Sequence, residues 1–168
     1  MPPADPYAPA DAPVGVLFVC LGNICRSPLA EGVFRHLAHE RGVDHRFRID
    51  SAGTGAWHVG QPPDPRSVDV ARRHGVTLDG QRARQVRDDD CADFHYLVAM
   101  DNDNLRTLER LRDDWADAGS LALLRAWDPE PGDGEVPDPY YGGPGGFDEV
   151  FRMIRRSAEG LLEDMLSE

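Results

Sequence analysis

Cysteine and arginine side chains stand close together in the stretch VLFVCLGNICRSPLAEGVF, residues 16–34. Five residues separate Cys20 from Arg26, and a connection this short can curl so that its backbone N–H groups point inward and bind an anion. Gly22 and Asn23 tolerate the positive φ angles that such a tight turn uses. The planar guanidinium of Arg26 matches two oxygens of a phosphate and keeps its charge at any working pH. The residue types and their spacing therefore predict a site for an oxyanion such as phosphate.

A nucleophile would lie at the floor of this turn. Inward N–H groups, the start of the following helix and Arg26 all favour the thiolate form of Cys20, and a thiolate is a strong nucleophile at neutral pH. A phosphate ester held above it could be attacked in line at phosphorus while the amides and Arg26 hold the other oxygens. The expected intermediate is a phosphocysteine that water later hydrolyses. No second cysteine pair or histidine cluster completes a metal site, so we expect neither a metal nor another cofactor.

The leaving oxygen of such an ester needs a proton from a carboxylic acid. Asp138, in the segment PDPYYGG, is the candidate, because Pro137 and Pro139 stiffen its backbone and the following glycines let the loop fold over a cleft. Its carboxylate could then activate water in the second half of the reaction. Tyr140 and Tyr141 beside it could wall an aromatic slot. The alternative for Asp138 is a plain turn-forming role, since Asp-Pro is a common turn opener.

The elements around these residues predict an α/β fold. Residues 14–20 are apolar on both faces, as in a buried parallel strand, and a helix with an apolar stripe follows, with Ser27 as its expected cap and Gly42 at its end. Further strands are expected over 46–52, 95–100 and 120–125, and further helices over 66–74 and 101–113 and at the carboxyl end. This alternation predicts a three-layer α/β/α domain around a four-stranded parallel sheet, with the phosphate-binding turn after the first strand. Ligands bind at the carboxyl ends of such strands.

The length and composition of the chain limit its domain number, its compartment and its partners. With 168 residues, three cysteines and a formal net charge of −12, the chain is expected to be one reduced, cytoplasmic domain over residues 14–168 after a disordered N-terminal extension over residues 1–13. The extension lacks the basic and apolar parts of a signal peptide, and no later run is long enough to span a membrane. The negative charge also disfavours nucleic acid as a partner.

These residues carry a resemblance to a known family. VCLGNICRSPLAE, followed far downstream by DPYY, resembles the low-molecular-weight protein tyrosine phosphatases, in their bacterial form. The likeness extends through DSAGT, WHVGQPPDPRS, RRHG and MDNDNL to the last helix. It implies that Cys20 is the nucleophile, Arg26 the phosphate clamp and Asp138 the general acid and then base. The implied substrates are phosphotyrosine proteins or small aryl phosphates, with inorganic phosphate as a product and a cognate tyrosine kinase as a partner.

The resemblance also assigns roles around the turn. Ser27 would hydrogen-bond the Cys20 sulfur, Asn23 would be held by Ser51 with His74 in the same supporting network, and Cys25 would guard Cys20 through a reversible disulfide. The residues implied in substrate binding are Leu21, Gly22, Asn23, Ile24, Cys25, Ser27, Trp57, Tyr140 and Tyr141. From residue type alone, His74 before Gly75 is expected at a helix terminus or as a buried structural residue. Cys25 could be a small buried apolar residue, and Trp57 could equally belong to the core.

Two other functions use the same residues. An arsenate reductase on this scaffold would bind arsenate in the turn and pass oxidation to a downstream cysteine pair, but only Cys91 is available there. A silent phosphotyrosine-binding module would need neither the thiol of Cys20 nor the acid Asp138. The three chemistry-bearing residues together therefore favour a metal-independent phosphotyrosine phosphatase.

Overall fold

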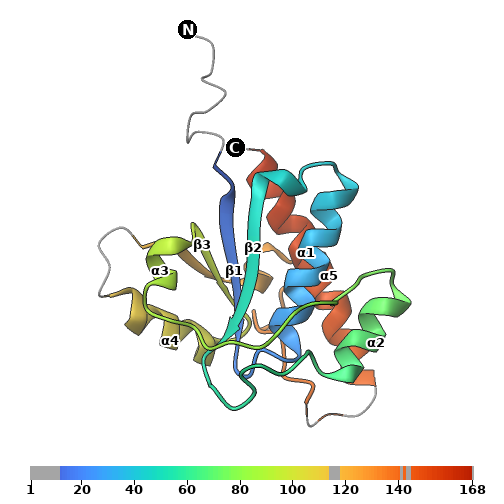
Figure 1. Ribbon diagram of the computed structural model, residues 1–168. Helices are drawn as coiled ribbons and strands as arrows, with labels where there is room; N and C mark the ends of the chain where they lie inside the picture. The colour runs from blue at the N-terminus through green and yellow to red at the C-terminus, as the bar shows by residue number, and fades with distance from the viewer. Residues whose placement is uncertain (1–11, 114–117, 141, 143–144, 168) are drawn as a thin grey trace, which may run out of the picture.

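Four parallel strands form the central sheet of the structure, a computed structural model that describes residues 12–113, 118–140, 142 and 145–167. The strands are β1 (Val14–Cys20), β2 (Phe47–Gly53), β3 (Tyr96–Ala99) and β4 (Ser120–Leu123). They lie in the order β2, β1, β3, β4, and every neighbouring pair is parallel. Their carboxyl ends therefore meet at one edge, the lower edge in Figure 1.

Helices cover both faces of this sheet (Figure 1). On one face lie α1 (Arg26–Glu40), α2 (Pro65–Arg73) and α5 (Gly145–Leu166), and on the other lie the short α3 (Asp90–Asp93) and α4 (Asn102–Arg112). Two 3₁₀ turns, Asp44–Arg46 and Leu124–Trp127, precede β2 and follow β4. The expected α/β/α architecture with a four-stranded parallel sheet is confirmed.

Strand β1 supplies both halves of the core because its side chains alternate between the two faces. Phe18 belongs to the larger cluster under α1 and α5, whereas Leu17 belongs to the cluster on the α3 and α4 side, and neither is exposed. Cys20 shares the face of Phe18. The strand therefore delivers the Cys20 thiol to the side of the sheet where α1 begins.

Most expected boundaries lie within a residue or two of the observed ones. The first strand is confirmed over residues 14–20 and the expected ends at Gly42 and Gly75 follow α1 and α2, where both glycines take a positive φ. The fourth strand was expected to run to residue 125, but it ends at Leu123 because the chain turns into a 3₁₀ helix. The expected N-terminal extension lies almost wholly outside the described residues.

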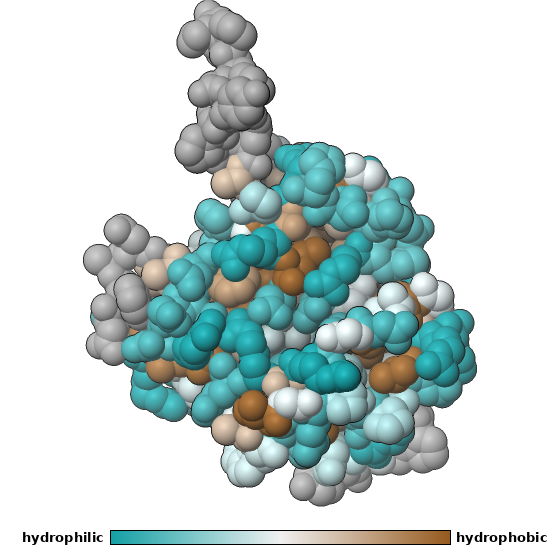
Figure 2. Space-filling view, in the orientation of Figure 1, coloured by the Kyte–Doolittle hydropathy of each residue, from teal (hydrophilic) through white to brown (hydrophobic). Residues whose placement is uncertain are grey.

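The face of the protein seen in Figure 2 is mostly polar. Figure 2 shows a hydrophilic face on which apolar side chains form only small, separate patches. Among the described helices, none combines the length and the apolar character needed to cross a bilayer.

Candidate active site

A cleft of about 400 Å³ opens at the carboxyl edge of the sheet, where β1 passes into α1. Segments far apart in the chain contribute to it: the turn after β1, the loop after β2 and the loop before α5. Its lining residues are Cys20, Leu21, Gly22, Ile24, Cys25, Arg26, Trp57, His58, Asp138 and Tyr140. The structure therefore brings the predicted thiol, guanidinium and carboxylate to one cavity.

Asn23 gives the turn its shape. Its φ is 57°, in the left-handed region that few residues other than glycine adopt, whereas Gly22 has no positive φ. The buried side chain holds this conformation from three directions: Nδ2 donates to Ser27 Oγ at 2.8 Å and to Ser51 Oγ at 3.0 Å, and Oδ1 accepts from the backbone N–H of Arg84 at 3.0 Å. Of the two residues that tolerate a positive φ, the turn uses it at Asn23 and not at Gly22, where a Cβ would lie 3.1 Å from the His58 ring.

The Cys20 sulfur makes two hydrogen bonds inside the turn. The backbone N–H of Asn23 donates to it over 3.3 Å, and the Ser27 hydroxyl lies 3.0 Å away. Ser27 was expected to cap the helix, but α1 begins at Arg26 after Cys25 with no side-chain cap. Its hydroxyl lies beside Cys20 instead. Because Asn23 Nδ2 donates to Oγ, the hydroxyl proton is available to the Cys20 sulfur at 3.0 Å or to the Ala52 carbonyl oxygen at 3.5 Å.

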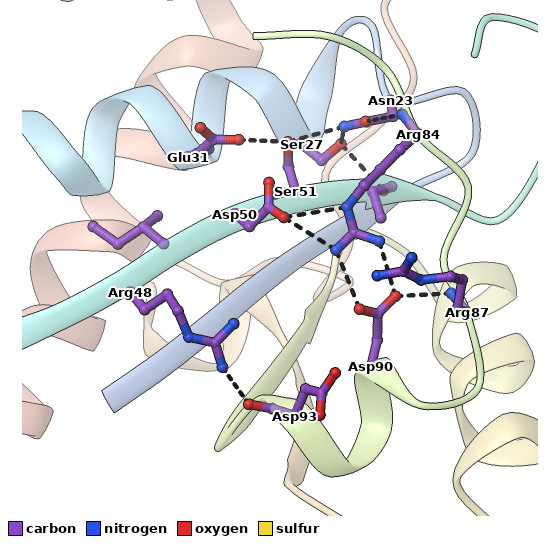
Figure 3. Close-up of polar contacts among 12 residues, drawn as sticks. Asn23, Ser27, Glu31, Arg48, Asp50, Ser51, Arg84, Arg87, Asp90 and Asp93 are labelled. Carbon is purple, nitrogen blue, oxygen red and sulfur yellow. Dashed lines mark hydrogen bonds and ion pairs between the residues drawn. The ribbon is translucent and has the colours of Figure 1, made fainter. Parts of the chain in front are cut away.

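A chain of hydrogen bonds continues behind the turn (Figure 3). Ser51 donates from Oγ to Oε1 of Glu31 at 2.7 Å, which leaves its lone pairs for Asn23. Glu31 is 6% exposed, and burial raises the pKa of its carboxyl despite the bonds from Ser51 and Arg35. The chain therefore links a buried carboxyl of α1 to the Cys20 sulfur through Ser51, Asn23 and Ser27.

A pair of carboxylates, those of Asp50 and Asp90, fixes the segment whose backbone binds the Asn23 side chain. Arg84, whose backbone holds the Asn23 side chain, lies between Asp50 and Asp90 in Figure 3. Its Nε donates to Asp50 at 3.1 Å, and its two Nη atoms donate to Asp90, which is 1% exposed, at 3.0 and 3.2 Å. Burial opposes the charge of Arg84, but these carboxylates outweigh it and raise its pKa. Neither Glu31 nor Arg84 was singled out from the sequence.

Arg26 enters the cleft from the first turn of α1 and is 2% exposed. Its Nη1 donates to Asp101 Oδ2 at 2.7 Å and to the carbonyl oxygen of Val136 at 2.9 Å, while Nη2 lies 3.8 Å from Asp138 Oδ2. Burial disfavours its charge, but Cys20, Asp101 and Asp138 outweigh this effect and raise its pKa. The guanidinium is thus a permanent cation held from behind by its Nη1 atom.

Asp138 lies at the mouth of the cleft, with its side chain 39% exposed. Its Oδ1 accepts a hydrogen bond from the backbone N–H of Tyr140 at 3.0 Å. The other oxygen, Oδ2, faces Arg26. Arg66 holds Tyr140, since its Nη1 donates to the Tyr140 carbonyl at 3.1 Å and its guanidinium lies 5.3 Å from the Tyr140 ring centroid. Tyr141, also expected here, lies outside the described residues.

The outer wall carries aromatic side chains from the loop after β2. Trp57 is 70% exposed, so it is a rim residue and not part of the core. His58, which sequence reasoning missed, lines the cleft 6.4 Å from the Tyr140 ring. Its position directly after Trp57 in the segment WHVG was the only available signal.

Cys25 lies in the lining but is 4% exposed and holds a free thiol. Burial, with the negative charges of Asp64, Cys20 and Asp138, raises the pKa of this thiol to about 12. Cys25 is therefore protonated at neutral pH.

His74 is not in the network that the resemblance implied. It ends α2, is exposed, and stacks on Phe151 of α5 with ring centroids 4.3 Å apart. The expectation of a helix terminus is correct, while Glu31 and Arg84 occupy the place assigned to a histidine beside Ser51 and Asn23.

Comparison with known proteins gives the site its family. Residues 15–168 match the family described as low molecular weight phosphotyrosine protein phosphatase. The chain belongs to this family. It is 41% identical to the low molecular weight protein-tyrosine-phosphatase YfkJ of Bacillus subtilis, over 92% of this chain and 97% of that protein. It is 47% identical to a Streptomyces coelicolor member, over 88% of this chain and 90% of the relative. The predicted family is therefore confirmed.

Solved structures of family members superpose on the whole fold. The crystal structure of YfkJ matches with a TM-score of 0.86 and 40% identity, covering 93% of this chain and 96% of that one. A protein tyrosine phosphatase from Entamoeba histolytica matches with a TM-score of 0.83 and 34% identity, covering 92% and 97%. These comparisons therefore support the phosphatase family.

Proposed function

We propose that this family member hydrolyses phosphotyrosine esters through a phosphocysteine formed on Cys20, without a metal ion. The observation that carries the proposal is the convergence of three groups on one cleft: a sulfur that accepts from the Asn23 N–H, the fixed cation of Arg26, and the carboxyl group of Asp138 at the mouth. Each supplies a different part of phosphoryl transfer.

In the first step the Cys20 thiolate attacks phosphorus, forming an S–P bond as the P–O bond to the phenol breaks. The turn's N–H groups and Arg26 stabilise the three remaining oxygens as charge spreads over them. Asp138, protonated at this stage, donates its proton to the leaving phenolate. The products are phosphocysteine and a free phenol.

In the second step water attacks the same phosphorus and the S–P bond breaks. Asp138, now a carboxylate, takes a proton from that water. The Ser27 hydroxyl, 3.0 Å from the sulfur, donates to the departing thiolate of Cys20 and so favours its release. Inorganic phosphate leaves and the enzyme is restored.

The aromatic walls suggest the substrate class. Trp57 and Tyr140 line the cleft above Cys20, and their aromatic faces can pack against the phenyl ring of a tyrosine phosphate, a contact that a serine phosphate lacks. We place the reaction in the cytoplasm with a tyrosine kinase as its counterpart. We also retain the proposed guard role of Cys25: after a peroxide has oxidised Cys20 to a sulfenic acid, the Cys25 sulfur, once it has lost its proton, would attack the Cys20 sulfur, forming the disulfide and releasing water.

The test is release of phosphate from phosphotyrosine in excess chelator. We expect Cys20→Ser to lower kcat by at least ~10³-fold, as loss of a nucleophile does elsewhere, and Cys25→Ser to retain most activity. An unchanged rate in Cys20→Ser would end the proposal, and loss of activity in chelator would end its metal-independent form.

A further inference from the structure

The carboxyl group of Asp138 is carried by a loop that forms neither helix nor strand over residues 128–139. A general acid on such a loop can act only if the loop is fixed relative to the phosphate site. We propose that Arg125 is the residue that positions Asp138: its buried guanidinium holds this acid loop (residues 128–138) so that the carboxyl group faces Arg26. The inference deepens the proposed function and rests on the role given there to Asp138.

Arg125 grips the acid loop on both sides. It lies in the 3₁₀ turn Leu124–Trp127 and is 6% exposed. Nη2 donates to the carbonyl oxygen of Glu130 at 2.7 Å and Nη1 donates to that of Glu135 at 2.8 Å. One guanidinium therefore binds the backbone of the acid loop at two positions, Glu130 and Glu135, and fixes them relative to each other.

Asp128 orients this guanidinium. It is 4% exposed and accepts from Arg125 Nε at 3.1 Å, while Arg156 of α5 donates to both of its oxygens from the other side. Burial alone would raise the pKa of Asp128, but the bonds from Arg156, the Glu130 N–H and Arg125 keep it below its ordinary value. The buried cation thus has a charged partner, as buried charges require.

The backbone connects the segment that Arg125 holds directly to the active site. Val136, directly after Glu135, is fully buried; its N–H donates to the Met100 carbonyl at 2.8 Å and its carbonyl accepts from Arg26 at 2.9 Å. Asp138 follows two residues later, with Oδ2 3.8 Å from Arg26. A shift at Glu135 would therefore move both a ligand of the phosphate clamp and the acid.

Only an arginine can make this set of contacts. Its planar fork offers five N–H groups in fixed directions, enough for one carboxylate and two carbonyls, whereas a lysine ammonium is a compact point charge. Replacement of Arg125 leaves the carbonyls of Glu130 and Glu135 without this donor and loosens the loop. The expected loss falls on protonation of the leaving group, which Asp138 performs.

The experiment compares kcat/KM for two substrates, because this ratio covers the steps up to release of the phenol. Phosphotyrosine needs a proton on its leaving group, and para-nitrophenyl phosphate, whose phenol is more acidic, needs it less. We expect Arg125→Met to lower kcat/KM on phosphotyrosine by ~10- to 100-fold, as misplacing a catalytic group does, and by less than ~3-fold on the nitrophenyl ester. Equal losses on both substrates would overturn the inference.

Arg156→Met is the matched control. It removes the other guanidinium bound to Asp128. It leaves both bonds from Arg125 to the carbonyls of Glu130 and Glu135 in place. We expect it to lower stability and to leave the ratio between the two substrates unchanged. The same selective loss in this variant would show that any damage to Asp128 suffices and would contradict the special role of Arg125.

A double variant separates action through Asp138 from a direct effect. If Arg125 acts only by positioning this acid, Arg125→Met adds little to the loss already caused by Asp138→Asn. Multiplied losses in the double variant would contradict the inference. Asp138→Asn alone tests the proposed function. If this variant does not lose more activity on phosphotyrosine than on the nitrophenyl ester, Asp138 is not the general acid. If it does so but Arg125→Met does not, only the positioning role of Arg125 is contradicted.

Folding is checked by inorganic phosphate, which reports on the turn and Arg26 without needing an acid. We expect the inhibition constant of phosphate to change by less than ~3-fold in Arg125→Met, because Asp101 still holds Arg26 Nη1 when the Val136 carbonyl shifts and the backbone amides still bind the anion. Arg125→Lys, which keeps the charge beside Asp128, should fold if Arg125→Met does not. It should show a smaller loss of the same selective kind, and a lysine variant with no selective loss would overturn the inference.

Discussion

Arg26 and Asp101 form a short ion pair at the back of the cleft, with Nη1 donating to Oδ2 over 2.7 Å. The other oxygen of Asp101 accepts from the backbone N–H of Asn104 and so caps α4. One carboxylate therefore joins the start of a helix on one face of the sheet to the phosphate clamp on the other. Both of its oxygens are committed, which makes the residue sensitive to substitution.

Asp101→Asn places one NH₂ group where two acceptors are needed. In either orientation this NH₂ group faces another donor, Arg26 or the Asn104 N–H. We expect the substitution to lower the free energy of unfolding by about 1 to 3 kcal/mol. It should also lower kcat/KM by ~10-fold, because Arg26 is less well oriented. Denaturant unfolding and steady-state kinetics measure the two effects. Asp103→Asn, exposed in the same first turn, is the control and should change neither by much.

Asp138→Asn removes the proposed acid while leaving an acceptor for the Tyr140 N–H. Because the leaving phenolate of phosphotyrosine depends on protonation, kcat/KM for it should fall by ~10²-fold or more, a usual contribution of general acid catalysis. Esters of more acidic phenols should lose progressively less. A series of aryl phosphates measures this dependence, and a loss independent of the phenol would remove Asp138 from the mechanism.

Cys25 gives the protein a pH-dependent stability. Burial raises its pKa to about 12 in the folded protein, whereas an unfolded cysteine titrates near about 8.5. Above a pH of about 8.5 the unfolded chain loses the Cys25 proton that the folded protein keeps. The contribution of Cys25 to the free energy of unfolding is therefore fully present below that pH. It declines as the pH rises further, by up to about 1.4 kcal/mol per pH unit. Unfolding measured from pH 7 to 10 should show the parent losing stability faster than Cys25→Ala; parallel curves would contradict the burial of a neutral thiol.

Two substitutions separate the backbone and side-chain roles of Asn23. Asn23→Gly keeps the left-handed conformation but loses the bonds to Ser27, Ser51 and Arg84, while Asn23→Ala loses the bonds and also strains the backbone. We expect Ala to be less stable than Gly by about 1 kcal/mol, with both lowering kcat/KM because the turn is no longer fixed. Equal stability of the two variants would show that the φ of 57° costs alanine nothing.

The sequence was sufficient for the fold and for the short-range part of the site. Continuous apolar character defined β1, and the spacing from Cys20 to Arg26 placed a thiol and a cation in one turn. Asp138 was predicted by its proline-stiffened loop and by the resemblance, and the structure places it at the cleft. These features depend on local chemistry, which a sequence displays directly.

The long-range part could not be predicted in the same way. Glu31, Arg84 and Asp101 act through partners that only the folded sheet brings together, and nothing in their neighbouring residues distinguishes them from surface charges. Residue type predicted Ser27 as a helix cap, because serine commonly begins helices, and this was wrong. The contact with the Cys20 sulfur that the resemblance implied is present at 3.0 Å. His74 was assigned to the network by analogy, whereas the ring stacks on α5.

The central claim is that the phosphoryl group passes through Cys20. The most direct measurement mixes the protein with phosphotyrosine, quenches turnover rapidly in denaturant and locates the phosphoryl group by mass spectrometry of the resulting peptides. The account predicts a phosphoryl group on the Cys20 sulfur, formed and lost at rates that match turnover. A protein that turns over phosphotyrosine with the phosphoryl group on another residue, or on none, would contradict it.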